Sequence, residues 1–137
     1  MAIEYSFESL LPEVQKATEE QIAAALEAVG QAAETFVAAK APTNKKTHGS
    51  QLKQSITHTV IGNTAYIGTN ESYAVYVEFG TGKYAEGGKG RPTPWVYQDD
   101  RGEWHRTSGS RAQPFMRPGI NDHIEDFKRV IVAHLSD

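Results

Sequence analysis

Tyr73-Ala-Val-Tyr-Val-Glu-Phe-Gly-Thr81 is the most unusual run in this chain, because apolar and aromatic residues follow one another closely and stop at a glycine. The run is too short for periodicity to distinguish a strand from a short helix. Glu78 lies between two apolar neighbours, where an unpaired buried charge would be prohibitively costly. We therefore expect a structural ion pair, for which Lys83, Arg91 and Arg117 are the candidate cations.

Ala112-Gln-Pro-Phe-Met-Arg-Pro118 is a second unusual run, in which Phe115 stands between Pro114 and Pro118 just before a predicted helix. Apolar residues recur every three or four positions from Pro118 to about Leu135, which predicts one helix over that range. Acidic residues precede basic ones along it, and this order complements the helix dipole.

Residues 12–39 are predicted to form a single long helix, with a proline in the first turn, where its missing N–H costs nothing. The apolar stripe comprises Val14, Thr18, Ile22, Ala25, Val29, Ala32 and Phe36. Such a helix would be about 40 Å long, more than one small domain needs to cover its core. Some of it should therefore meet another subunit. Gly30 weakens the helix by about 1 kcal/mol relative to alanine and is a candidate bend.

A flexible basic loop is predicted at residues 40–50, which combine proline, glycine and small polar residues without apolar periodicity. A helical turn is then expected at 52–55, with strands at 56–61 and 64–69. The strands flank Gly62-Asn63, a favourable two-residue turn, and the resulting register pairs Val60 with Ala65 and His58 with Ile67. A lone histidine on the apolar side of a hairpin is more often packed and hydrogen-bonded than a ligand or a switch.

Residues 82–111 are predicted to form a projecting arm. Its first part is a loop rich in glycine and proline. The segment Trp95–Thr107 then suggests a hairpin around the four-residue connection Asp99-Asp-Arg-Gly102, which would pair Tyr97 with Trp104.

These elements predict a single α+β domain over residues 1–137, in which helices cover antiparallel hairpins. A chain of this length is near the modal domain size. It contains no cysteine, which excludes disulfides and thiolate metal sites and suits assembly in a reducing cytoplasm. We find neither a signal segment nor an apolar stretch of the length that a bilayer requires, so no membrane association is expected.

The net charge of −3 conceals a division along the chain. Residues 1–39 hold seven acids and one lysine, residues 40–53 hold four lysines and no acid, and residues 83–117 hold seven basic and four acidic side chains. Such separation allows an acidic face of one copy to meet basic loops of another, although solvated faces would show the same pattern.

No catalytic, cofactor-binding or metal site is predicted. Asp99, Asp100, Glu103 and His105 form the only local cluster that resembles a metal or acid–base site, but hairpin turns select aspartate and glycine for backbone reasons. The glycine-rich stretches near 80–90 lack the lysine-serine ending and the following helix of a phosphate-binding loop. A metal-dependent hydrolase is therefore a weak alternative.

The two runs together resemble the tail-component family of siphophages, in which Tyr-Ala-x-Tyr-Val-Glu-Phe-Gly-Thr and Pro-Phe-x-x-Pro recur. Their matching residues here are Tyr73, Tyr76, Glu78, Phe79, Gly80, Thr81, Pro114, Phe115 and Pro118. The resemblance spans roughly residues 10–135 and favours a helix at 73–79. It departs from the family at Ser50, which stands where a glycine is usual, and at Gly119, which stands where alanine often follows the second proline.

That family includes tail-completion and neck proteins of lambdoid type and is related to lambda's minor tail protein Z. The resemblance implies a non-enzymatic virion protein, assembled in the host cytoplasm, that forms a ring, expected to be hexameric, at the head–tail junction. Connector or stopper, tail terminator and tail tube proteins are its expected neighbours. The expected subunit-interface residues are Ile22, Val29, Phe36, Lys45 and Lys46. The expected partner-docking residues are Trp95, Tyr97, Trp104 and Arg106.

The alternative function is a nucleic-acid-binding module. Basic loops beside Trp95, Tyr97 and Trp104 could stack on single-stranded nucleic acid or contact phage DNA in passing, as cationic aromatic platforms do. The overall acidity of the chain argues against this as the main activity.

Overall fold

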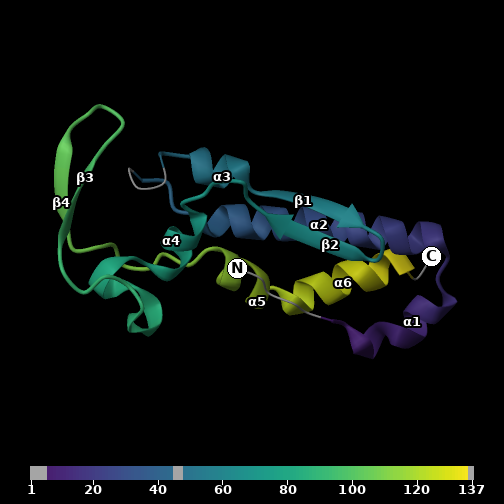
Figure 1. Cartoon of the computed structure of the whole chain (residues 1–137). Helices are drawn as coiled ribbons and strands as arrows, with labels where there is room; N and C mark the ends of the chain where they lie inside the picture. The colour runs from purple at the N-terminus through teal and green to yellow at the C-terminus, as the bar shows by residue number, and fades with distance from the viewer. Residues whose placement is uncertain (1–5, 45–47, 136–137) are drawn as a thin grey trace.

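The protein is α+β, as predicted, with helices and two separate antiparallel hairpins (Figure 1). The computed structural model describes residues 6–44 and 48–135, so Lys45 and Lys46 lie outside the described residues. In chain order the elements are η1 (Glu8–Leu10), α1 (Leu11–Lys16), α2 (Glu19–Lys40), α3 (Gln51–Ser55), β1 (Thr57–Ile61), β2 (Thr64–Gly68), α4 (Ala74–Phe79), η3 (Gly82–Tyr84), η4 (Glu86–Gly88), β3 (Trp95–Gln98), β4 (Trp104–Thr107), α5 (Met116–Asn121) and α6 (Ile124–Leu135).

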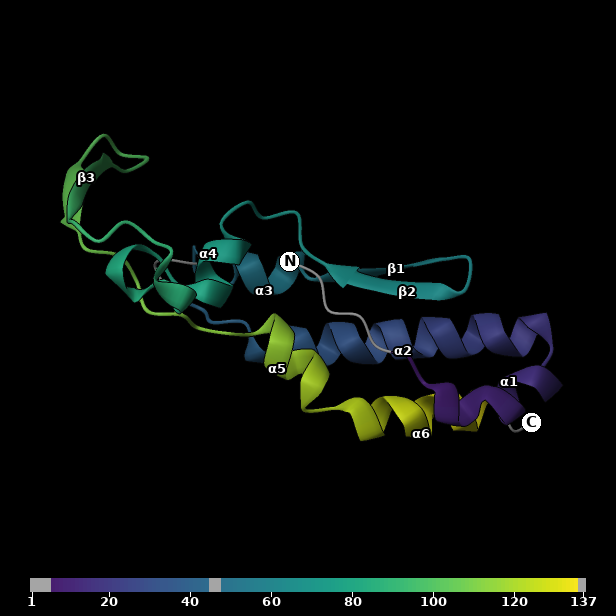
Figure 2. The same cartoon turned by 60° about the horizontal axis from the view of Figure 1, so that its bottom comes forward.

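Helix α2 lies at the centre of the molecule. The β1–β2 hairpin covers one side of it, and α5 and α6 cover another (Figure 2). The β3–β4 hairpin projects from one end of this elongated body, whereas α1 lies at the opposite end (Figure 1). The two ends of the molecule are therefore built from different elements.

The prediction of one helix over residues 12–39 is wrong at its start, because the chain breaks at Ala17, whose ψ of 151° is extended. Thr18 caps α2: its hydroxyl accepts the backbone N–H of Gln21, and the Gln21 side chain accepts the N–H of Thr18. This reciprocal capping box satisfies N–H groups that a continuous helix would bond internally. Thr18 is thus a cap and not a member of the apolar stripe.

The β1–β2 hairpin has the predicted register, with Val60 opposite Ala65 and His58 opposite Ile67. Its inner face packs on α2, and a Cβ built on Gly30 would lie 2.5 Å from His58 Cδ2. Gly30 is therefore required so that the His58 ring can pack closely on α2. This contact explains the glycine better than the predicted bend in the helix does.

His58 is hydrogen-bonded to two carboxylates of α2, which confirms the prediction that it is packed and hydrogen-bonded within the domain. Nδ1 lies 2.5 Å from Glu34 Oε2, and Nε2 lies 3.1 Å from Glu27 Oε2. The hydrogen bond to Glu34, and after it the one to Glu27, raises the pKa of His58 above its ordinary value. The positive charge on this ring is thereby stabilised in the folded state.

Replacing His58 with glutamine is expected to remove about 1.5 kcal/mol of stability at acidic pH and less at alkaline pH. Because the folded-state pKa is raised, the contribution is fully present below the ordinary value of 6.5 and is lost as pH rises through the folded value. Urea unfolding of both proteins across this range measures the difference. A difference that stayed constant or grew with pH would contradict the ion-pair account.

The core lies between the C-terminal half of α2, α3, α4 and α5. Its fully buried apolar side chains are Val37, Leu52 and Phe115. Gly119 lets α5 approach α2 closely, since a Cβ on it would lie 2.7 Å from the Cα of Val37. This close contact explains why glycine stands at position 119.

The predicted helix from Pro118 to Leu135 is wrong in two respects. It begins earlier, at Met116, and it is interrupted between α5 and α6 at Asp122 and His123. The ring of His123 stacks on Phe36 of α2 with 3.6 Å between centroids, and its Nδ1 bonds Asp126. These contacts fix His123 at the break between the two helices. Because they are tertiary contacts, the apolar periodicity of the sequence could not predict the break.

Helix α2 corrects the expectation that no stretch is long enough for a bilayer, because it has 22 residues and contains an 18-residue window with a mean hydropathy of 1.2, which meets that requirement by length and composition alone. Glu27 and Glu34 lie along it and bond His58, and α6 and the hairpin pack against it. Ionised side chains in the middle of a helix, such as Glu27 and Glu34, are costly to place in lipid. The packing is that of a central helix in a folded domain.

Candidate partner-docking surface

The two unusual sequence runs meet at Glu78, whose side chain has no exposed surface. Its Oε1 accepts the backbone N–H groups of Phe115 and Met116 at 3.0 and 2.8 Å. Its Oε2 accepts Arg117 Nε at 2.7 Å. The predicted ion pair is therefore present, and of the three candidate cations it is Arg117, not Lys83 or Arg91, that pairs with Glu78.

Arg117 extends this contact into a network. Its guanidinium also donates to the Glu78 backbone carbonyl and to both carboxylate oxygens of Glu86, and it lies over the Phe79 ring. Burial raises the pKa of Glu78, but Arg117 and the backbone N–H groups outweigh it, so the pKa lies below its ordinary value. Glu78 is thus a buried carboxylate, both of whose oxygens accept hydrogen bonds within the domain.

The remaining residues of the first run divide into buried and exposed positions. Tyr73 packs against the core cluster, and Gly80, at a φ of 80°, lies against the backbone of Ser110. The Thr81 hydroxyl accepts the Ser110 N–H at 2.9 Å. Tyr76, by contrast, is 61% exposed. Its side chain is available for contacts outside the domain.

The arm hairpin differs from its predicted register by one residue, because Tyr97 pairs with His105 and Trp104 pairs with Gln98. The Asp99 N–H donates to the Glu103 carbonyl, so the loop holds three residues instead of four and ends at Gly102, whose φ is 82°. A shift of one residue moves a side chain to the other face of a hairpin.

The predicted docking residues therefore lie on two opposite faces of the arm. The inner face carries Trp95 and Tyr97, which line a groove of about 1300 Å³ between the arm, the 80–91 segment and α4. The outer face carries Trp104 and Arg106 together with Val96. Trp104 is 68% exposed. The arm thus presents two separate surfaces, one lining the groove and one facing away from it.

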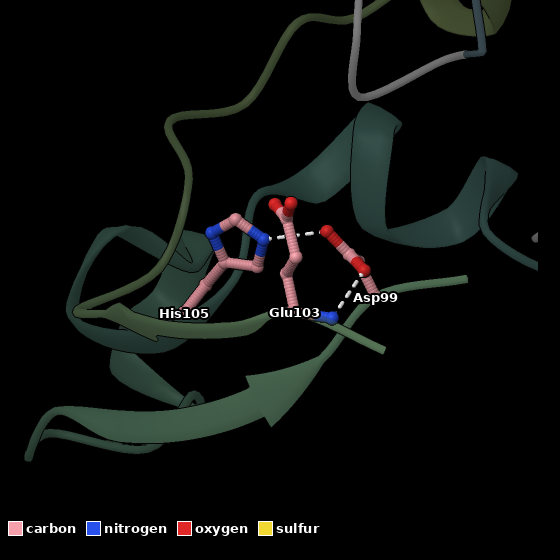
Figure 3. Close-up of side chains that lie close together, drawn as sticks. All are labelled: Asp99, Glu103 and His105. Carbon is pink, nitrogen blue, oxygen red and sulfur yellow. Dashed lines mark hydrogen bonds and ion pairs between the residues drawn. The ribbon is translucent and has the colours of Figure 1, made fainter. Parts of the chain in front are cut away.

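Asp99, Glu103 and His105 lie together at the tip of the arm (Figure 3), and one ligand atom of each falls within 4.8 Å of the others. The first oxygen of Asp99 accepts the Arg101 and Glu103 N–H groups, and the second lies 2.7 Å from His105 Nε2. His105, and after it the Glu103 N–H, lowers the pKa of Asp99. The bonds of Asp99 close the turn, whereas the Glu103 carboxylate lies beside Asp99 and His105, and Asp100 is not part of the cluster.

The predicted subunit-interface residues on α2 are half-buried. Phe36 stacks on His123 and contacts Phe127 at 5.9 Å between centroids, so it packs within its own chain. Ile22 and Val29 keep partial exposure. Sequence reasoning missed two exposed features: Val75 beside Tyr76 on α4, and α1, in which no residue is buried. Neither leaves a signal in the sequence, because exposure depends on the tertiary fold.

Residues 6–80, more than half of the chain, match the family model described as "Bacteriophage HK97-gp10, putative tail-component". The match covers η1 to α4 and ends at Gly80, before the arm. No curated protein matches the chain, and no solved structure does.

Proposed function

Because this chain belongs to the HK97-gp10-like family of bacteriophage tail components, we propose that it is a structural protein of the head–tail junction that completes the tail without catalysing a reaction. Membership of the family implies a location in the virion and contacts with other virion proteins. The finer assignment is to the lambdoid tail-completion and neck type, which includes relatives of lambda's minor tail protein Z.

In this proposal the protein forms a ring, hexameric in the assembled particle, that docks on connector or stopper, tail terminator or tail tube proteins. Ile22 and Val29 of α2 and the basic Lys45 and Lys46 are the proposed contacts between subunits. A contact that repeats head to tail by rotation closes into such a ring. Acidic residues concentrate in the first 39 positions and lysines in the next 14, which supports complementary contacts between neighbours.

The outer face of the arm is the observation that carries the proposal. It exposes Val96 and Trp104, with Arg106 directly opposite Val96 and two residues from Trp104, on a hairpin that projects from the body (Figure 1). Tryptophan and arginine are the residues most enriched among energetically dominant interface contacts. An exposed pair on a projecting hairpin is therefore well placed to dock a neighbouring virion component.

Replacing Trp104 with alanine is expected to reduce the joining of heads and tails by at least about tenfold, because loss of a dominant contact costs about 2 kcal/mol or more. The fold should be retained, since the indole is mostly exposed. Infectious titre and electron microscopy of particles made by a phage carrying the variant measure the effect. The matched control is Tyr66→Ala, an exposed aromatic on β2.

Intact joining by the Trp104 variant would remove the proposed role of the outer face. Absence of the protein from purified particles with complete necks would overturn the proposed function itself. Mass spectrometry of purified particles makes this second measurement.

The nucleic-acid alternative is supported by the stacking of Arg91 over the Trp95 ring, 5.8 Å from its centroid, with Arg106 lining the same hollow. Titration with short single-stranded DNA at physiological salt distinguishes the two functions. Tight binding that weakens steeply with salt would favour the nucleic-acid module.

A further inference from the structure

Helix α1 makes few contacts within the described part of the chain, where it touches mainly η1 and α6. No residue of it is buried, and it exposes Leu11 (53%) and Val14 (36%). These two side chains are three positions apart and therefore share one face of the helix. A helix of six residues is not stable in water by itself. A second surface that covered Leu11 and Val14 would stabilise this end of the molecule.

The arm at the opposite end also lacks support, since a two-stranded hairpin alone is marginally stable in water. Its base, however, is fixed by a close backbone crossing. A Cβ on Gly82 would lie 2.1 Å from the Ser108 carbonyl oxygen, and one on Gly109 would lie 2.1 Å from that of Thr81. Backbone hydrogen bonds from Thr81 to Ser110 and from Lys83 to Ser108 close the same crossing. The groove between arm and body is therefore preformed.

The groove matches a short amphipathic helix in size and character. Val75 and Tyr76 of α4 and Tyr97 of the arm line it, and all three are substantially exposed. Six helical residues form a cylinder about 9 Å long and 10 to 12 Å wide, which occupies roughly 700 to 1000 Å³. The groove offers about 1300 Å³.

The charges at the two ends are complementary. The acids near α1 that form no ion pair among the described residues are Glu8, Glu13, Glu19 and Glu20. Several cations of the arm region likewise form no ion pair among the described residues, and they include Lys83, Lys89, Arg91 and Arg111. Of these, Lys89 and Arg91 line the groove. Asp99 and Asp100 also line it. Their charge disfavours a phosphate backbone as the occupant more than it disfavours a mixed helix.

We propose that α1 of one copy docks in the groove between α4 and the arm of the next copy, with Leu11 and Val14 against the aromatic lining. The inference deepens the proposed function, on which it rests for its place in the virion. Because the two surfaces differ, the contact is head to tail and generates a ring or an open filament. The inner face of the arm then binds a second copy, and its outer face stays free for another virion component.

The absence of cysteine from the chain permits a direct test. Val14→Cys and Tyr76→Cys are purified separately, mixed in equal amounts, oxidised and resolved on a non-reducing gel. The mixture is expected to give severalfold more disulfide-linked dimer than either variant alone. The matched control mixes Tyr76→Cys with Ile61→Cys, an exposed apolar position in the β1–β2 hairpin. Leu11→Cys with Tyr97→Cys is a second pair, in case one variant folds poorly by circular dichroism.

Charge reversal provides an independent readout. Glu13→Lys with Glu20→Lys is expected to lower the cross-linked yield severalfold, and adding Lys89→Glu with Arg91→Glu in the other partner is expected to restore it. Oxidation traps transient encounters, so a chain that is monomeric in isolation is still tested. Equal yields for the Val14/Tyr76 and Ile61/Tyr76 mixtures would overturn the docking. Short DNA that abolished the specific cross-link by occupying the groove would instead assign the groove to nucleic acid.

The docking and the proposed function fail in distinguishable ways. If the protein is present in purified particles but the specific cross-link does not form, the virion role stands and the docking is wrong. If the cross-link forms but the protein is missing from particles with complete necks, the docking stands and the virion role is wrong.

Discussion

Replacing Glu78 with alanine is expected to lower the free energy of unfolding by about 3 to 5 kcal/mol, because removal of one member of a buried ion pair leaves its partners uncompensated. The N–H groups of Phe115 and Met116 would lose their acceptor, and the Arg117 guanidinium would lose its shortest bond. The segment that begins α5 would then detach from α4. Urea unfolding followed by far-ultraviolet circular dichroism measures the loss.

Glu86→Ala is the matched control, because it removes the exposed carboxylate that pairs with the same Arg117, and it should cost at most about 1 kcal/mol.

The contribution of Glu78 should also depend on pH. Its folded pKa is lowered, so the stabilisation is present above the ordinary value of 4.5 and is lost as pH falls through the folded value. Equal losses for the two variants, or a Glu78 contribution that increased in acid, would show that the buried network is misassigned.

Replacing Phe115 with alanine is expected to cost about 3 to 5 kcal/mol, since the removed ring leaves a cavity that the neighbours fill only in part. The ring is fully buried in the cluster that joins α2, α3, α4 and α5. Phe115→Leu keeps most of the apolar volume and should cost less than about 1.5 kcal/mol. The midpoint of urea unfolding gives both values.

Tyr66→Ala is the control for the two Phe115 variants, because substitutions of exposed side chains usually change stability by about 0.5 kcal/mol or less. If the alanine and leucine variants of Phe115 were equally stable, the second sequence run would have a role other than core packing. A loss from Tyr66→Ala as large as that from Phe115→Ala would indicate that the outer face of the β1–β2 hairpin is also buried.

Local turn chemistry and charge pairing were readable in the sequence. Gly62-Asn63 has few compatible turn types, and the register of β1 and β2 follows from it. Glu78 required a cation because of its apolar neighbours, and Arg117 was among the candidates. The threonine and glutamine that form the capping box of α2 were equally readable, but the apolar periodicity continued through Thr18 and concealed them.

The features that could not be predicted from the sequence depend on tertiary contacts. The arm register depends on an Asp99 carboxylate that closes a three-residue loop, whereas the sequence suggested four. The break between α5 and α6 depends on the stacking of His123 on Phe36, a residue distant in sequence. The roles of Gly30 and Gly119 depend on the close approach of other elements. Exposure of α1 and of Tyr76 likewise follows only from the assembled fold.

Both tryptophans of the chain, Trp95 and Trp104, lie in the arm and outside the core. Intrinsic indole emission therefore reports on the local surroundings of this hairpin and is nearly blind to melting of the helices. Fluorescence and circular dichroism are expected to give denaturation curves that do not coincide, even where the body unfolds in one cooperative step. Such a mismatch would record the separate opening of a peripheral hairpin, not an intermediate in folding of the domain.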